Sequence, residues 1–223
     1  MAAEERGASA GLPHAMPSSF AESPWPARPF TPGDADARDA ALHEQIGADE
    51  PVWRGGVIDV HNLSVTLPDG AAEHRDVVRH PGGVAVVAVT PGGQVPVVRQ
   101  YRTPFDAVTV EIPAGKLDPG EEPAVAARRE LREETGFVAD ELVPLVSVAP
   151  SPGYSDEVVH VYLAHGLRFV GASPDADEFL NVDMVDMSEL VAAVLDGSIT
   201  DAKTVAGILA AHAREAALHR RSK

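Results

Sequence analysis

The run RELREE at residues 129–134 has the residue types and spacing of a metal site. In a helix, Glu130 and Glu134 are four residues apart, so they lie on one face with Cβ atoms about 5–6 Å apart, and Glu133 flanks them. Such carboxylates can converge on hard divalent cations, which prefer oxygen ligands. Two such ions about 4 Å apart can clamp a phosphoryl group and activate a water. Taken alone, the run also fits a solvated helix with ordinary surface ion pairs.

The elements expected around this run place it on a helix that follows a loop. Residues 115–120 are expected to form the loop and residues 122–135 the helix. Pro123 stands where a first-turn proline is tolerated, and Gly136 stands where a helix end needs a left-handed residue. Leu131 belongs to an apolar strip that would pack the helix against a core.

Alternating or continuously apolar segments bounded by turn residues predict strands along the rest of the chain. The expected strands are Val57–Val65, Arg75–Arg79, Val84–Thr90, Gln94–Tyr101, Thr109–Ile112, Leu142–Val148, Glu157–Leu163 and Asn181–Met187. The first two form an antiparallel hairpin around Pro68–Gly70. Ser188 and Asp201 are expected to cap two C-terminal helices. This order predicts an α+β domain with α/β/α layers.

The composition narrows the range of partners. A formal net charge of -16 disfavours nucleic acids and anionic membrane surfaces. The absence of cysteine excludes disulfides and thiolate chemistry, and it fits a cytoplasmic location. No apolar run approaches the roughly 20 residues that span a bilayer.

The first 50 residues differ from the rest. They carry scattered prolines and no sustained hydrophobic period. We therefore predict a flexible tail over 1–50, with a short helix near 37–46, and one folded domain over 51–223.

Residues 115–137, GKLDPGEEPAVAARRELREETGF, resemble the Nudix box, written G-x5-E-x7-R-E-U-x-E-E-x-G-U with U an apolar residue. A chance match is on the order of one in a billion per starting position. The matching residues are Gly115, Glu121, Arg129, Glu130, Leu131, Glu133, Glu134, Gly136 and Phe137. The resemblance implies the Nudix fold, an α/β/α sandwich with a mixed central sheet.

The resemblance also implies roles for individual residues. Glu130 and Glu134 would be the principal metal ligands, with Glu133 beside them, and the carbonyl of Ala114 would add a ligand. Arg129 and Glu121 would form an ion pair that fastens the loop to the helix. Magnesium is the implied ion, with manganese as a substitute.

The flanking segments resemble the ADP-ribose pyrophosphatase branch of the Nudix family, over roughly residues 52–212. In that branch the arginine after Gln-Tyr, here Arg102, contacts the phosphates or ribose of the substrate. A guanidinium suits phosphate because it stays charged and binds in a bidentate manner. Glu111 would orient the adenine or the arginine, although an edge-strand carboxylate without a role is an equal alternative.

Two loops complete the expected site. Ser151 and Gly153 lie in a turn that would close over the substrate. The branch also has a glutamate in a loop before the last strand, acting as general base or as an extra metal ligand. Glu178 is the candidate for that role, with Asp177 next.

The expected activity is magnesium-dependent hydrolysis of ADP-ribose to AMP and ribose 5-phosphate. Other small nucleotide substrates remain alternatives, namely GDP-mannose, another sugar nucleotide or an oxidised nucleotide. A non-catalytic domain that senses ADP-ribose is a further alternative. Members of this branch are usually homodimers in which the N-terminal hairpin, here 52–79, completes the neighbouring site.

Overall fold

The computed structural model describes residues 39–173 and 179–221. The chain divides into two units, Met1–Leu42 and His43–Lys223. The described part of the first unit is a 3-10 turn over Asp39–Leu42. Asp177 and Glu178, the candidates for general base, lie outside the described residues.

The second unit contains three helices and ten strands within its described residues. The strands are β1 (Gln45–Arg54), β2 (Asp59–Thr66), β3 (Ala72–Arg79), β4 (Gly83–Ala88), β5 (Gln94–Arg102), β6 (Ala107–Glu111), β7 (Ala114–Lys116), β8 (Phe137–Val148), β9 (Val159–Phe169) and β10 (Leu180–Asp186). The helices are α1 (Pro123–Thr135), α2 (Met187–Leu195) and α3 (Ala202–Arg221), and a 3-10 turn spans Thr103–Phe105.

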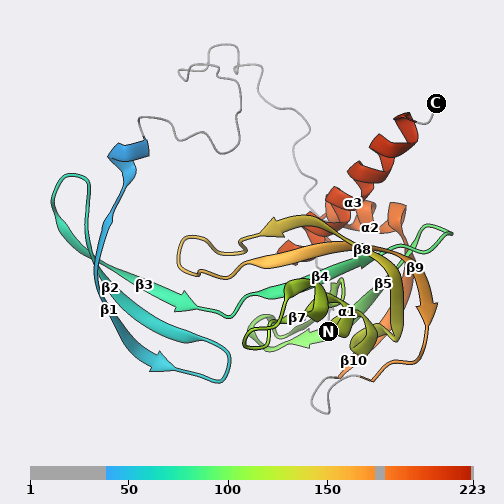
Figure 1. Cartoon of the computed structure of the whole chain (residues 1–223), viewed down its shortest axis with the longest axis horizontal. Helices are drawn as coiled ribbons and strands as arrows, with labels where there is room; N and C mark the ends of the chain where they lie inside the picture. Colours follow the sequence, from blue (N-terminus) through green and yellow to red (C-terminus); the bar gives the residue numbers. More distant parts are fainter. Residues whose placement is uncertain (1–38, 174–178, 222–223) are drawn as a thin grey trace, which may run out of the picture. The chain divides into compact units, whose positions relative to one another are not determined.

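The central sheet has four strands in the order β7-β4-β9-β8, with β4 and β9 parallel and the other pairs antiparallel. All of β4 is buried, and its side chains alternate between two apolar clusters. Val84 and Val86 belong to the cluster that contains Leu131 of α1. Ala85 and Val87 belong to the cluster that contains Ile208 of α3. Helices therefore cover both faces of the sheet, which confirms the predicted α/β/α sandwich (Figure 1).

A second, antiparallel sheet has the order β10-β5-β6. Its central strand β5 ends at Arg102, and β6 ends at Glu111. Because β5 and β6 are antiparallel, Arg102 lies opposite Ala107 and Glu111 lies opposite Val98, so the Arg102 side chain extends along the sheet to bond Glu111.

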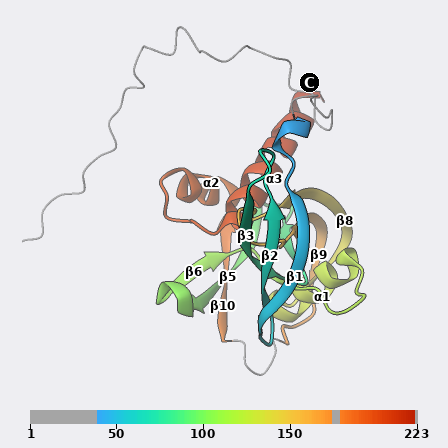
Figure 2. The ribbon, with the colours of Figure 1, turned by 90° about the vertical axis from the view of Figure 1, so that its left-hand side faces the viewer.

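The third sheet contains the predicted hairpin, β2 and β3, and an additional strand, β1 (Figure 2). The predicted helix near 37–46 is wrong beyond Leu42, because β1 begins at Gln45. Two features removed the strand signal from this segment. All ten residues of β1 are exposed, so no apolar face alternates with a polar one, and its pairing with β2 shifts register twice.

The expected helix ends are partly confirmed. Pro123 opens α1, and Gly136 ends it with a φ of 74°, donating its N–H to the carbonyl of Arg132 at 2.9 Å. Asp201 accepts from the N–H of Thr204 at 3.0 Å, as expected for a cap at the start of α3. The prediction for Ser188 is wrong, because Asp186 holds the N-cap position of α2. No helix within the described residues combines the length and apolarity needed to span a bilayer.

Candidate active site

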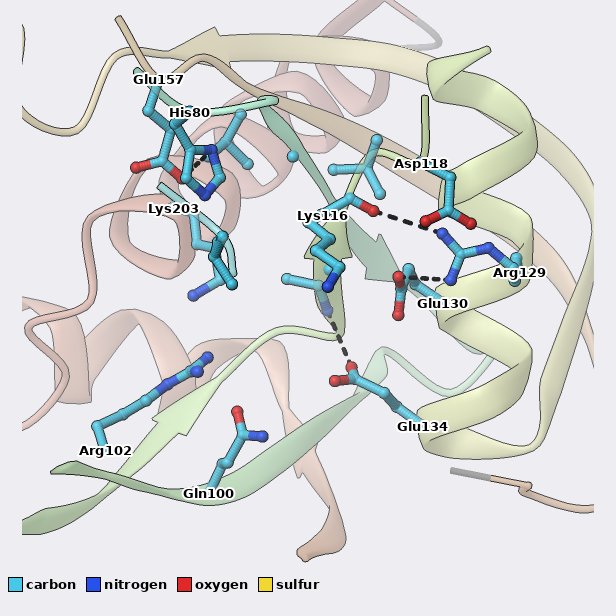
Figure 3. A pocket seen from close by; sticks show the side chains of 16 residues that line it. His80, Gln100, Arg102, Lys116, Asp118, Arg129, Glu130, Glu134, Glu157 and Lys203 are labelled. Atoms are coloured by element: carbon cyan, nitrogen blue, oxygen red, sulfur yellow. Dashed lines mark hydrogen bonds and ion pairs between the residues drawn. The ribbon is translucent and has the colours of Figure 1, made fainter. Parts of the chain in front are cut away.

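A cavity of about 490 Å³ lies between α1 and the ends of β5 and β7, with the first turn of α3 on its opposite side. Figure 3 shows that Glu130 and Glu134 reach it from α1, whereas Arg102 and Lys203 reach it from across the cavity. Helix α1 thus supplies two carboxylates, and the facing wall supplies two cations.

Glu130 and Glu134 are buried, with 6% and 2% of their surface exposed. Glu134 accepts the N–H of Ala114 at 2.9 Å, which ties β7 to α1. Glu130 lies against Gly115, where a Cβ would meet the glutamate Oε1 at 2.0 Å. The first glycine of the box is therefore required by the close approach of a carboxylate, rather than by its own dihedral angles.

Arg129 forms the predicted ion pair with Glu121, through Nε–Oε1 at 3.0 Å and Nη2–Oε2 at 2.8 Å. These bonds raise the pKa of Arg129 and lower the pKa of Glu121. Arg129 Nη1 also donates to Glu130 at 2.7 Å and to Glu133 at 3.1 Å. Arg129 therefore orients the loop and two of the box glutamates at once, while Glu133 is not among the residues that line the cavity.

The donor set suits magnesium or manganese, because Glu130, Glu134 and Ala114 all line the cavity and offer oxygen atoms. Among residues 39–173 and 179–221, no group of three or more His, Asp or Glu side chains forms a complete metal site. Mg²⁺ is usually held by one or two carboxylates together with waters and substrate phosphates.

Arg102 and Glu111 form a bidentate ion pair, with both bonds at 2.7 Å. Thr109 Oγ1 donates to the same carboxylate at 2.6 Å. Burial by itself raises the pKa of Glu111, but the bonds from Arg102 and Lys203 outweigh it and lower the pKa to about 2. Glu111 thus contacts the arginine, and its expected role in orienting the adenine or the arginine stays a prediction.

Lys203 was missed by sequence reasoning. Its Nζ donates to Glu111 at 2.5 Å and to Asp201 at 2.9 Å, and it lines the cavity. The sequence contains one signal for it. A lysine just after a helix cap stands where the helix dipole disfavours a positive charge, so it favours nearby carboxylates, of which Asp201 is the local one.

The turn before β9 contributes differently from the prediction. The carbonyl of Ser151 accepts the N–H groups of Tyr154 and Ser155, at 3.1 and 2.9 Å, which closes the turn. Neither Ser151 nor Gly153 lines the cavity in this chain, whereas Glu157 does. Their predicted contact with substrate stays a prediction.

Comparison with known proteins gives a family match. The NUDIX domain model matches residues 79–207. The chain is 43% identical to an ADP-ribose pyrophosphatase of Bacillus subtilis (strain 168), over 79% of this chain and 96% of that protein. It is 40% identical to a methanol dehydrogenase activator of Bacillus methanolicus, over 77% of this chain and 94% of that protein.

A solved structure described as an ADP compounds hydrolase has the same fold. It superposes with a TM-score of 0.70 at 23% identity, over 80% of this chain and 98% of that chain.

Proposed function

The chain belongs to the Nudix family, and we propose that it hydrolyses the diphosphate of ADP-ribose to AMP and ribose 5-phosphate. One observation carries this proposal: two buried carboxylates on α1 face two cations across a single cavity. This arrangement suits a diphosphate, which needs cations to neutralise its own charge and carboxylates to hold further cations. The 43% identical ADP-ribose pyrophosphatase supports the choice of substrate.

The proposed cofactor is Mg²⁺, with Mn²⁺ as a substitute. Glu130, Glu134 and the carbonyl of Ala114 would hold it, in keeping with their oxygen donors at the cavity. When bound, a divalent ion neutralises phosphoryl oxygens and lowers the pKa of a bound water.

The protein side chains would position the reactants. Arg102, aligned by Glu111, would donate hydrogen bonds to phosphoryl oxygens. Arg129 would hold Glu130 and Glu133 in place. In the reaction a water attacks one phosphorus in line, the bridging P–O bond breaks, and the bridging oxygen leaves with one of the two products. We propose Glu178 as the base that takes the proton of that water.

Rival functions differ in substrate or lack catalysis. GDP-mannose, another sugar nucleotide or an oxidised nucleotide would use the same carboxylates. A regulator that only binds ADP-ribose is disfavoured, because every carboxylate of the box is present and Glu130 and Glu134 line the cavity.

The test is a substrate panel assayed with Mg²⁺, with Mn²⁺ and with a chelator, with products identified by mass spectrometry. The expected result is that ADP-ribose has the highest kcat/KM, yields AMP and ribose 5-phosphate, and is not cleaved after chelation. Preference for a nucleoside triphosphate would overturn the substrate. Binding without cleavage would favour the regulator.

A homodimer and a cytoplasmic location stay predictions, and so does the N-terminal tail, except over residues 45–50, which belong to β1. In support of a dimer, β1 exposes Val52 and Trp53, with 61% and 55% of their surfaces accessible. Such large apolar side chains on an edge strand favour association. Sedimentation velocity of the full chain would measure the oligomeric state directly.

A further inference from the structure

The wall of the cavity that faces Glu130 and Glu134 carries two cations which share one buried carboxylate. Arg102 at the end of β5 and Lys203 in the first turn of α3 both bond Glu111. We propose that Lys203 is a substrate-binding residue that forms, with Arg102, a two-cation subsite for one phosphoryl group of the diphosphate. This inference rests on the proposed function, because it assumes a diphosphate substrate.

The cluster presents its positive side to the cavity. Arg102 and Lys203 line the cavity, whereas their partners Glu111 and Asp201 do not. The four side chains sum to zero formal charge. The Glu111 side chain is only 3% exposed and the Arg102 side chain is 39% exposed. Lys203 and Asp201 are 14% and 22% exposed, so for this second pair it is the lining of the cavity by Lys203 that places the cation on the cavity side. An anion that enters the cavity therefore contacts the two cations and not their carboxylate partners. The attraction is stronger than in water because the partly buried wall has a lower effective dielectric constant. Figure 3 shows the two cationic groups near each other.

Both cations keep hydrogen-bond capacity for a ligand. An ammonium has three N–H donors, and in the described part of the chain Glu111 and Asp201 accept two of those of Lys203. A guanidinium has five, and Glu111 accepts from Nε and Nη2 of Arg102. The remaining donors of the two groups come from a strand and a helix but open on one cavity, where they can bond the two non-bridging oxygens of one phosphorus of the diphosphate.

The needs of Glu111 alone do not account for Lys203. Its position near the N-terminus of α3 is unfavourable to a positive charge. Arg102 already neutralises Glu111 and binds both of its oxygens, and Thr109 donates to one. The second cation therefore balances Asp201, and it is placed so that it also lines the cavity. It is useful where a doubly charged substrate must be neutralised.

The variant Lys203→Gln separates binding from positioning. Glutamine keeps one donor for Glu111 and removes the charge. With ADP-ribose and saturating Mg²⁺, we expect KM to rise about ten- to hundred-fold, the usual effect of losing a charged hydrogen bond, with kcat changed less than about threefold. Inhibition by ribose 5-phosphate and by AMP would be measured in parallel, and the product whose inhibition constant rises marks the phosphoryl group that Lys203 contacts.

Arg214→Gln is the matched control. Arg214 lies on the same helix, is exposed, and donates to the carbonyl of Pro144. It removes the same charge from the same element without reaching the cavity, so KM should stay unchanged. This controls for the change in long-range repulsion between the anionic substrate and a chain of net charge -16 when one positive charge is removed.

The outcomes are distinguishable. Lys203→Arg should recover most of the affinity, because it restores the charge. An unchanged KM in Lys203→Gln overturns the proposal. A lower kcat and a lower melting temperature with unchanged product inhibition also overturn it, because that pattern marks a residue that only positions Glu111. If the wild type does not cleave ADP-ribose, the proposed function fails instead. Calorimetric titration with inorganic pyrophosphate then tests the subsite alone, and equal affinity of wild type and Lys203→Gln refutes it.

Discussion

Gly115→Ala tests whether the position of one buried carboxylate limits turnover. A Cβ at residue 115 would lie 2.0 Å from Oε1, 2.1 Å from Cδ and 2.5 Å from Oε2 of Glu130. Reaching an ordinary contact of about 3.4 Å would push Oε1 back by about 1.4 Å. The backbone of Gly115 is not in the left-handed region, so alanine meets no strain of its own.

The displaced group is the end of a flexible side chain, so the fold should survive. We expect loss of about 1–2 kcal/mol from the disturbed Arg129–Glu130 bond, which lowers the melting temperature by roughly 2–8 °C. The effect on kcat should be much larger than the effect on stability. A misplacement of about 1 Å at a reacting centre can cost about a hundred-fold, so kcat should fall by at least that factor, with a higher Mg²⁺ requirement.

The assay combines thermal unfolding by circular dichroism with ADP-ribose turnover across a Mg²⁺ titration. Gly92→Ala is the control, because a Cβ there meets only Thr90 Oγ1, at 3.8 Å, and should leave both measurements unchanged. If Gly115→Ala turns over within threefold of wild type at ordinary Mg²⁺, then Glu130 does not need its observed position and the reasoning is wrong.

Three further predictions follow from the same contacts. Glu134→Gln should reduce kcat by several powers of ten at nearly unchanged melting temperature, since the amide oxygen still accepts the Ala114 N–H; near-normal turnover would contradict a metal role. The pKa of Glu111 is lowered from 4.5 to about 2 on folding, so its contribution to stability is complete above about pH 4.5 and is lost as pH falls towards 2. Urea unfolding should therefore show a wild-type advantage over Glu111→Gln that shrinks across this range, and an advantage independent of pH would refute the assignment. A chain starting at His43 should keep the unfolding midpoint and turnover of the full chain, because the whole cavity lies in the second unit; lost turnover would place the first 42 residues in the enzyme.

Local signals predicted most of the fold. Helix α1 was predictable because Pro123 and Gly136 act within a turn of the residues they terminate. Strand β4 was predictable from continuous apolar residues, and so was the buried first part of β9, whereas the more exposed second half of β9 extends beyond the predicted end at Leu163. Strand β1 was not, because its exposed residues carry no period and its pairing partner supplies the order.

The site divides in the same way. Glu130 and Glu134 are neighbours on one helix, so their convergence follows from helical geometry alone. Lys203 bonds Glu111, which lies 92 residues earlier in the sequence, and no local pattern predicts that these two residues are in contact. The sequence left the role of Glu111 open for the same reason, because that role depends on which cations the tertiary fold places beside its carboxylate.

The ion pair between Glu111 and Lys203 can form only after α3 has been synthesised. Ribosomes extend the chain from the N-terminus, so both buried glutamates of α1 are made long before α3. A nascent chain that stops at Ile199 holds every carboxylate of the box but lacks the ammonium across from them. Helix α3 is therefore the element that adds the Lys203 ammonium to the cavity, after the carboxylates of α1 have been made.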